Sequence, residues 1–589
     1  MDTISQKYLI STSINLFHNI DLENSILLGN WCIPNDMHHK IAKEQIFRFI
    51  WSNRKKYEEA YFDSINIFED MLLFLKDEIN SRLKQNFDIQ FYRVVLSPWL
   101  IHYIHQSYDK YINIFEVFEE NKNIIAYTLN VKNNIIPVDY TDFIELTTNS
   151  GIYNLQQYSQ IVKYLEYNHK DVTLKKEQKQ KNIYKTKTNK MRYIVDKTCS
   201  YISSKVHNQS DLTNITSPYF HNKLSKYKLW FFGKFKYILD DMDYDLSVEL
   251  NIDREKRKNH SQLSKKSYIN YLKENIFNDI PLLYFENICR FNDIVKSLPI
   301  KKCKIFYTAN AHYSSEIYKF YIAANYDKTT SIISQHGGVN GTHLLSLEEI
   351  DHQLADYIFT FGWKDRANEI PMYSFNSSLL YKTFKHTPKK NEILLISTAQ
   401  PKNIFRLHSS YSADEFQVLI NNSIDFLNVL NKYNVKFRGY PNDYGWNTND
   451  TLEKNIISQL NYDNNKKILD SYKTAEIVVS NHIGTTYLEA ISLNIPTVVF
   501  CDDNVTKFRD STNDIYTKLF KVGIFHKNGN SAALFIKNLY ETDGLNKWWN
   551  SIEIENVKKE FVQKYSNLTD NWYSKFNEQI DKLKENNDK

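Results

Sequence analysis

The pattern of hydrophobic and polar positions divides the chain into a helical first part and an α/β second part. In residues 44–82 and 91–118 the apolar positions follow the helical period, and neither stretch contains glycine. After about residue 280, short apolar runs alternate with polar, helix-patterned segments, which is typical of a parallel α/β sheet. The sequence therefore predicts long helices first and strand–helix alternation afterwards.

The strands that we predict in the second part are short and apolar. They cover residues 303–307, 330–334, 357–361, 392–397, 435–437, 477–480 and 497–500. Residues 373–391 are polar without a clear period and fall between two groups of strands, so we predict a linker there. In the helical part, Pro98 suits the first turn of a helix, with Ser97 as its N-cap.

Composition and charge exclude several classes of protein. The 589 residues suggest two to four domains, and 42% hydrophobic with 24% charged residues is ordinary for a folded protein. The formal net charge of +5 is too small to favour a nucleic-acid binder. The five cysteines lie far apart without a CxxC pair, which argues against zinc and disulfides and fits a reducing cytoplasm. No stretch resembles an export signal or a membrane span.

Two lysine-rich runs change this picture locally. Residues 169–190 carry eight lysines among few apolar residues, and a second basic run covers residues 254–266. Such runs are usually solvated loops or helix faces. The alternative is a patch that binds an anionic acceptor or lipid headgroups.

The strongest local signal for chemistry lies in residues 477–500, which read as strand, turn, helix and strand. The turn Gly484-Thr485-Thr486 opens the helix and offers free backbone N–H groups, two hydroxyls and the positive helix end, which together suit a phosphate. Glu489 follows one helical turn later, in position to accept hydrogen bonds from a ribose. The alternative is a simple helix cap with a turn glycine.

A second signal is the glycine-rich loop that follows the predicted strand 330–334. Gln335 and His336 precede Gly337 and Gly338, and this chain has few glycines, so the loop suggests close approach of backbone to a ligand. His336 at the strand end is placed to donate to a phosphate or to act as a general acid or base. A structural loop histidine is the alternative.

Arg438 ends the predicted strand 435–437 and forms the third signal. An arginine there makes paired, charge-assisted hydrogen bonds to a phosphate, unless it is an ordinary surface residue. All three loops follow strands, and ligands of open α/β sheets bind outside the carboxyl ends of the strands. We therefore expect these loops to meet in one cleft.

Acidic residues follow the glycine-rich loop at Glu348, Glu349 and Asp351. Glu349 and Asp351 are our candidate catalytic bases, although an acidic helix face also explains them. No Asp-x-Asp pair stands at a strand end, so we expect neither a metal nor another cofactor.

Short motifs across nearly the whole chain resemble a family of transferases encoded in bacterial O-antigen and other surface-polysaccharide gene clusters. The motifs are residues 29–32, 96–100 with 108–109, 335–338, 361–363, 440–446, 484–489 and 522–526. More distantly, Arg438 with Pro441 and the turn at 484–486 look like motifs of GT-B enzymes that use CMP-activated ulosonic acids, and of polyol-phosphate polymerases. Both of those classes bind a cytidine nucleotide. The chain departs from the family at Ser97, where many members have glycine, and its helical first part has no counterpart in simple GT-B enzymes.

The residues and the resemblance together imply an α/β, GT-B-like fold, in which two Rossmann-like domains face a cleft. We expect a largely helical N-terminal region at 1–125, an acceptor-side Rossmann-like domain with a basic insertion at 126–375, a nucleotide-donor Rossmann-like domain at 390–545 and a C-terminal helical tail at 546–589.

The implied function is transfer of a sugar from a nucleotide donor to a glycan or lipid-linked glycan acceptor, with a CMP-activated ulosonic acid as the suggested donor. Donor-binding residues would be Gln335, Gly337, Gly338, Arg438, Gly484, Thr485, Thr486 and Glu489, with His336 stabilising phosphate charge from the opposite half. Two alternatives stay open: a cytidine-nucleotide-dependent polyol-phosphate transferase, and a non-catalytic polysaccharide-assembly binding protein. We expect a cytoplasmic location, with work at the inner face of the membrane through the basic patches as a further hypothesis, and no nucleic-acid partner.

Overall fold

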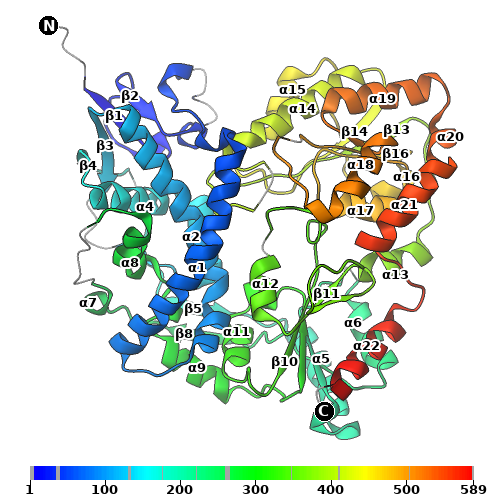
Figure 1. Ribbon diagram of the computed structural model, residues 1–589, viewed down its shortest axis with the longest axis horizontal. Coiled ribbons are helices and arrows are strands. Elements are labelled where there is room, and N and C mark those ends of the chain that lie inside the picture. Colours follow the sequence, from blue (N-terminus) through cyan, green and yellow to red (C-terminus); the bar gives the residue numbers. More distant parts are fainter. Residues whose placement is uncertain are drawn as a thin grey trace.

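The structure, a computed structural model, describes residues 6–34, 37, 40–129, 134–175, 177–220, 222–258, 265–346, 348–408, 411–502 and 504–586 (Figure 1). Within these residues the strands form three parallel sheets and one antiparallel pair. Two of the parallel sheets have six strands each and belong to the two Rossmann-like domains that the sequence predicted. The α/β, GT-B-like fold class is therefore confirmed.

The N-terminal region contains a sheet of its own as well as long helices. Strands β1 (Lys7–Ile10), β2 (Ser25–Leu27), β3 (Ile124–Leu129) and β4 (His169–Val172) pair in parallel in the order β2-β1-β3-β4. The helices are α1 (Arg54–Leu83), α2 (Ile89–Glu120), α3 (Tyr140–Asn149) and α4 (Gly151–Tyr164). The domain boundary that we drew after residue 125 falls inside β3, which pairs with strands from both sides of it.

Helix α2 corrects one expectation. It begins after its N-cap Asp88 and continues through Pro98 to Glu120, so Ser97 is an interior residue and not an N-cap. The Ser97 hydroxyl donates to the carbonyl of Arg93 one turn earlier. Pro98 removes one backbone hydrogen bond, but α2 is buried along most of its length, so packing keeps the helix continuous.

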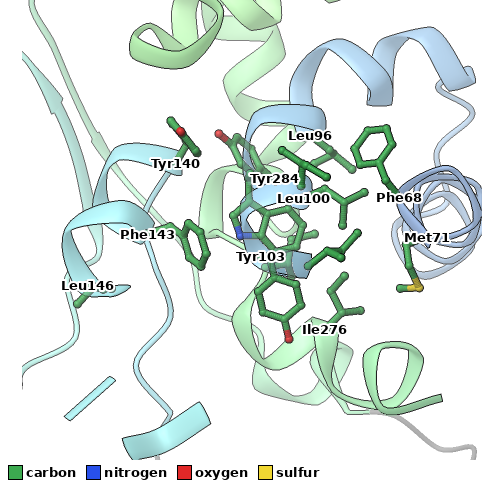
Figure 2. Close-up of a cluster of buried hydrophobic side chains, with 14 of the residues drawn as sticks. Phe68, Met71, Leu96, Leu100, Tyr103, Tyr140, Phe143, Leu146, Ile276 and Tyr284 are labelled. Atoms are coloured by element: carbon green, nitrogen blue, oxygen red, sulfur yellow. The ribbon is translucent and has the colours of Figure 1, made fainter. Parts of the chain in front are cut away.

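The largest core lies around α1 and α2. In Figure 2, Phe68 and Met71 of α1 and Leu96 and Leu100 of α2 lie in one cluster with side chains of α3 and of the first Rossmann-like domain. Trp99 at its centre is fully buried and stacks on Tyr103. This shared core holds the N-terminal region firmly against the first Rossmann-like domain.

The first Rossmann-like sheet has the order β12-β11-β10-β9-β6-β7 with all neighbours parallel. Its strands are β6 (Thr213–Thr216), β7 (Tyr237–Leu239), β9 (Ile305–Thr308), β10 (Thr330–Ser334), β11 (Tyr357–Thr360) and β12 (Glu369–Pro371). The helices are α5 (Lys190–Val206), α6 (Leu224–Phe232), α7 (Arg254–Arg257), α8 (Tyr268–Asp279), α9 (Ile288–Ser297), α10 (Ala311–Ser314), α11 (Glu316–Ala323) and α12 (Glu348–Leu354). The antiparallel pair β5 (Ile183–Thr186) and β8 (Leu246–Glu249) contains part of the first lysine-rich run. The second run lies partly outside the described residues.

The second Rossmann-like sheet has the order β15-β14-β13-β16-β17-β18, again all parallel. Its strands are β13 (Glu392–Ile396), β14 (Asn434–Arg438), β15 (Asn461–Tyr462), β16 (Ile477–Ser480), β17 (Thr497–Phe500) and β18 (Phe525–His526). The helices are α14 (Phe416–Val429), α15 (Thr448–Asn455), α16 (Ile468–Thr474), α17 (Thr485–Ser492), α18 (Asn513–Lys521) and α19 (Gly529–Glu541). This is the Rossmann order 3-2-1-4-5-6, whose switch point lies between β13 and β16.

The chain crosses between the two Rossmann-like domains twice. The first crossing is the predicted linker, which contains helix α13 (Phe375–Thr383); the second follows α20 (Leu545–Trp549) and α21 (Ile552–Tyr565) and leads to α22 (Trp572–Asn586). Helix α22 returns to the first domain, where it packs on the sheet beside α6 (Figure 1). Asn567 joins the two crossings, because its N–H donates to Phe361 and its carbonyl accepts from Ser374.

Candidate functional site

The two glycine-containing loops that the sequence singled out meet at the contact between the Rossmann-like domains. The N–H of Gly338, in the loop after β10, donates to the Thr485 hydroxyl at the start of α17, at 3.2 Å. A Cβ on Gly338 would lie 2.3 Å from the carbonyl oxygen of Gly484. Glycine is therefore required at this position by the close approach of the second domain. Two of the three loops that we expected to meet in one cleft are therefore in contact.

An arginine from the second domain fastens the same contact. Arg509 donates to the carbonyl of His343, to the Ser346 hydroxyl and to the Glu348 carboxylate, while its own N–H donates to the Thr342 carbonyl. Glu348 is buried and also accepts from the N–H of Gly341. Glu348, one of the acidic residues after the loop, thus accepts hydrogen bonds from both domains, from Gly341 of the first and from Arg509 of the second.

Gln335 organises the loop from within. Its amide nitrogen donates to the Gly337 carbonyl at 2.8 Å, and its amide oxygen accepts from the Phe361 N–H and the Trp363 indole. The side chain is buried. This network fixes the path of the backbone through His336, Gly337 and Gly338, whatever further role Gln335 has in donor binding.

His336 lies half-buried at the carboxyl end of the first sheet. Its ring packs edge-on against Tyr219, with ring centroids 5.7 Å apart. Burial lowers the pKa of His336 below its usual value; the Asp351 carboxylate partly offsets this and His312 adds to it. At neutral pH the imidazole is therefore uncharged, with one nitrogen able to donate and the other able to accept a proton.

The two predicted bases have different surroundings. Asp351 is buried, accepts a hydrogen bond from His312 at 2.9 Å and from the Tyr313 hydroxyl, and lies within electrostatic reach of His336. Glu349 forms an ion pair with Arg366 near the surface, and this pair lowers the pKa of Glu349. The structure thus brings Asp351, but not Glu349, to the group formed by His336, His312 and Tyr313, which we call the His336 cluster.

Glu489 lies buried in α17, between the two halves of the site. Its charge raises the pKa of Tyr219 from the first domain and of Tyr472 from the second, in each case after the larger effect of burial. The Tyr472 hydroxyl also donates to the Thr486 carbonyl at 3.0 Å. The carboxylate therefore lies where a ligand held by the start of α17 would meet it.

Arg438 lies beside a large cavity at the carboxyl ends of β13, β14 and β15. The cavity has a volume of about 510 Å³ and polar walls, made by Ser397, Thr398, Arg438, Tyr440, Asp443, Asn447, Asn449, Asp450, Asp463, Asn464 and Asn465 among others. Arg438 donates to the Asp463 carboxylate at 2.6 Å and to the Asn465 carbonyl. Its charge is therefore already compensated, and a phosphate bound here would share the guanidinium with Asp463.

Helix α16 connects Arg438 with α17. Ser471 lies within 3.4 Å of Arg438, and its neighbour Tyr472 bonds Thr486. The Thr486 hydroxyl oxygen is buried and has no hydrogen-bond partner among the described residues. A buried hydroxyl without a partner is costly, so a ligand group at this helix start would stabilise it.

Tyr219 is one of the residues of this site that sequence reasoning missed. It follows β6, is half-exposed, and has a left-handed backbone with φ +54°. Left-handed backbone is uncommon for a tyrosine and tends to occur at functional sites. Strand β6 reads Thr-Asn-Ile-Thr, so its polar composition hid both the strand and the loop behind it.

Comparisons with known proteins give one family and several weak structural similarities. The model of the LIC12162 family transferase matches residues 7–580. No curated protein matches the chain. Solved structures similar to it include a variant of the wall teichoic acid polymerase TagF (10% identity, 67% of this chain and 96% of that chain, TM-score 0.31), Acinetobacter baumannii MurG (11%, 63% and 99%, 0.32) and S. aureus MnaA with UDP (13%, 50% and 76%, 0.30). Similarities of this size carry no conclusion about function.

Proposed function

Because this chain belongs to the LIC12162 family of transferases, we propose that it is a glycosyltransferase that moves a sugar from a nucleotide donor to a surface-polysaccharide acceptor. The observation that carries the proposal is the polar cavity beside Arg438. Its volume of about 510 Å³ suits a nucleotide, since ligand pockets typically measure about 300–1,000 Å³. It also lies at the carboxyl ends of the strands, where open α/β sheets bind their ligands.

The start of α17 suits the phosphate of such a donor. The Gly484-Thr485-Thr486 turn presents the positive end of the helix and the partnerless Thr486 hydroxyl, and Arg438 is linked to this turn through α16. Glu489 is placed to accept hydrogen bonds from the ribose. In this arrangement the phosphate lies between the cavity and the domain contact.

His336 would face the leaving phosphate from the first domain. An imidazole that packs on Tyr219 can donate a hydrogen bond to the charge that develops on the phosphate, and donors of this kind act most strongly in a water-poor cleft. Asp351 is the better of the two candidate bases, because it belongs to the His336 cluster whereas Glu349 is engaged by Arg366. We propose no metal for this reaction; the helix end and fixed cations would carry the charge.

We expect cytidine nucleotides, CMP above all, to stabilise the protein more than uridine, guanosine or adenosine nucleotides do. The reason is the resemblance of Arg438 and the 484–486 turn to cytidine-using enzymes. A thermal-shift series measures this, since a ligand at 100 times its dissociation constant adds about 2.7 kcal/mol of stability. Equal stabilisation by UDP or GDP would contradict the cytidine assignment, and no stabilisation by any nucleotide would contradict the proposed function. Phosphorus analysis of the product separates sugar transfer from polyol-phosphate transfer.

The same series tests the site with Arg438→Ala, for which we expect about a tenfold or larger loss of nucleotide affinity. The matched control is Lys436→Ala, two residues earlier in β14. Lys436 also bonds a buried carboxylate, that of Glu392 at 2.8 Å, but it does not line the cavity. Both variants leave a buried carboxylate without its cationic partner. A loss of nucleotide affinity that Arg438→Ala shows and Lys436→Ala does not therefore reports on the ligand.

We further propose that the outer face of α5 and α6 docks on an anionic membrane surface, where a lipid-linked acceptor would be reached. This face exposes Met191, Ile194, Val195, Tyr201, Ile202 and Val206 on α5 and Leu224, Phe231 and Phe232 on α6. Exposed lysines lie among them at positions 187, 190, 205, 223, 228 and 234. An apolar helix face with basic neighbours is typical of helices that lie in the membrane interface. In the part of the chain that the structure describes, no helix has the length and hydrophobicity of a membrane span.

This docking face adjoins the cleft. Arg192, in the first turn of α5, bonds Asp241, and Asp241 accepts from the N–H of Ser217, two residues before Tyr219. We expect the protein to sediment with phosphatidylglycerol vesicles at low salt but not with phosphatidylcholine vesicles. Ile194→Glu with Ile202→Glu should abolish sedimentation, whereas Ile457→Glu, at a more exposed position elsewhere, should not. A wild-type protein that stays in the supernatant would rule out this surface.

A further inference from the structure

Arg406 is a partly exposed arginine deep in the protein, and it has no acidic partner among the described residues. It lies between β13 and α14, in a segment that packs against the N-terminal region. Among the described residues, no hydrogen bond or ion pair reaches its guanidinium, and the Nε atom is buried without a partner. Its strongest electrostatic neighbours are tyrosines, at positions 57, 140, 313 and 444. The charge is thus surrounded by aromatic rings and not by carboxylates.

Other arginines deep in the protein are paired. Arg257 bonds both oxygens of Glu286, each side chain being 4% exposed, and Arg54 bonds Glu415. Pairing is the usual condition for a charge removed from water, because an uncompensated one is strongly destabilising. Arg406 has no such partner among the described residues, and its partly exposed side chain is accessible to a counter-ion from outside the chain.

Three histidines surround the same place. The rings of His102 and His105 in α2 lie 5.9 and 6.1 Å from that of His408, two residues after Arg406. His102 also stacks on Phe405, over whose ring the Arg406 guanidinium lies at 4.8 Å. Four nitrogen-bearing side chains from two distant segments therefore share one small volume.

The hydrogen bonds of this cluster leave donors without acceptors. Nδ1 of His105 accepts from the N–H of Leu407 at 3.3 Å, so in the neutral ring Nε2 carries the proton. This Nε2 is fully buried and has no partner among the described residues, and neither has Nδ1 of His408. Burial, with Arg406 contributing, lowers the pKa of all three histidines, so Arg406 supplies the charge at neutral pH.

We propose that Arg406, His105 and His408 bind a phosphate group carried by a substrate, at a site distinct from the cavity beside Arg438. Phosphate suits these groups because it is an anion with several acceptor oxygens, and arginine is the side chain that pairs with it most readily. An incoming phosphate would neutralise the Arg406 charge and accept a hydrogen bond from Nε2 of His105.

The position of this site favours an acceptor phosphate. Residues 397–399, at the start of the same segment, line the donor cavity, and Tyr444, from the loop after β14, lies near Arg406. A phosphate at Arg406 therefore lies next to the donor and does not occupy the position of the donor's own phosphate. Phosphate binding at this site does not require the nucleotide to be CMP. The phosphate proposal and the proposed function can therefore be contradicted separately.

Calorimetric titration with inorganic phosphate tests the site. We expect wild-type protein to bind phosphate, Arg406→Met to lose at least about tenfold in affinity, and Arg438→Ala to keep the wild-type affinity at this site. Unchanged affinity in Arg406→Met, or no binding by the wild type, would overturn the proposal. Titration in the presence of saturating CMP distinguishes the source: additive binding assigns the site to the acceptor, and displacement assigns it to the donor. Both of these outcomes support phosphate binding at Arg406.

A stability measurement separates this role from a structural one. Without phosphate, Arg406→Met should melt at or above the wild-type temperature, because it removes an uncompensated charge and keeps a similar volume. The control Arg257→Met should melt clearly lower, because it strands the buried Glu286 carboxylate. If Arg406→Met is destabilised like Arg257→Met, Arg406 is a structural residue and the proposal fails.

Discussion

Replacing Gly338 by alanine is expected to open the contact between the two Rossmann-like domains and to lower turnover by about a hundredfold. The new Cβ would lie 2.3 Å from the Gly484 carbonyl oxygen and 2.7 Å from a methyl group of Leu488. The oxygen belongs to the backbone that starts α17, so it moves only with the helix. Overpacking of this kind costs about 1–3 kcal/mol. Turnover and the radius of gyration by small-angle X-ray scattering measure the two effects.

The neighbouring glycine provides the control. A Cβ on Gly337 would meet no atom closer than the Thr485 hydroxyl at 4.0 Å, so Gly337→Ala should keep the wild-type radius of gyration. Its turnover then reports whether a ligand approaches this backbone closely. A Gly338→Ala variant with wild-type scattering and turnover would show that the closed contact seen here is not needed for catalysis.

The strands of the two large sheets were predicted well where they are long apolar runs. All seven predicted strands are present, with ends displaced by at most two residues, and 330–334, 477–480 and 497–500 match the structure. Val, Ile, Leu and Phe in such runs are buried on both faces of a parallel sheet, so composition alone identifies them. This is why the α/β class and the order of its elements were accessible from the sequence.

Short strands were missed because their conformation depends on their neighbours. Three of the four residues of strand β6 are polar, and β12 is three residues ending in a proline at the sheet edge. Both are strands because β9 and β11 beside them supply the hydrogen-bonding pattern. Strands β1 and β2 of the N-terminal sheet were missed for the same reason, since they are four and three residues long.

The candidate site was foreseeable only in part. Glycines at strand ends predicted that the loops at 337–338 and 484–486 would meet, because backbone at the carboxyl edge of a sheet converges there. Tyr219 could not be assigned, because its strand was not recognised. The Arg406 cluster was equally hidden, since two of its three histidines, His102 and His105, lie some 300 positions earlier in the chain, as the 302-residue separation of His105 and Leu407 shows. The roles of the predicted donor-binding and catalytic residues stay predictions.

His336→Ala is expected to lower turnover by about 10²–10³-fold while the melting temperature changes little. The ring lies half-buried against Tyr219 at the edge of the cleft, so its removal leaves the cores intact. What is lost is a hydrogen bond to the leaving phosphate, which matters only as charge develops there. Release of CMP from a CMP-activated donor, per folded molecule, together with calorimetric melting, measures both quantities.

Two further variants show what the imidazole does. His336 faces Asp351, His312 and Tyr219, and its lowered pKa means that the neutral form prevails at pH 7. Protonation of the ring keeps its donor and adds positive charge, so the donor role predicts no loss of turnover as the pH falls from 7 through the lowered pKa. A fall in turnover over that range would instead identify His336 as a proton acceptor. His336→Gln keeps a donor that does not titrate, so it should recover part of the lost turnover. His526→Ala, a half-buried histidine at the end of β18 outside the cleft, should leave turnover unchanged. If His336→Ala instead lowers the melting temperature and keeps its turnover, His336 is a structural loop histidine, and the phosphate must be stabilised from the second domain alone.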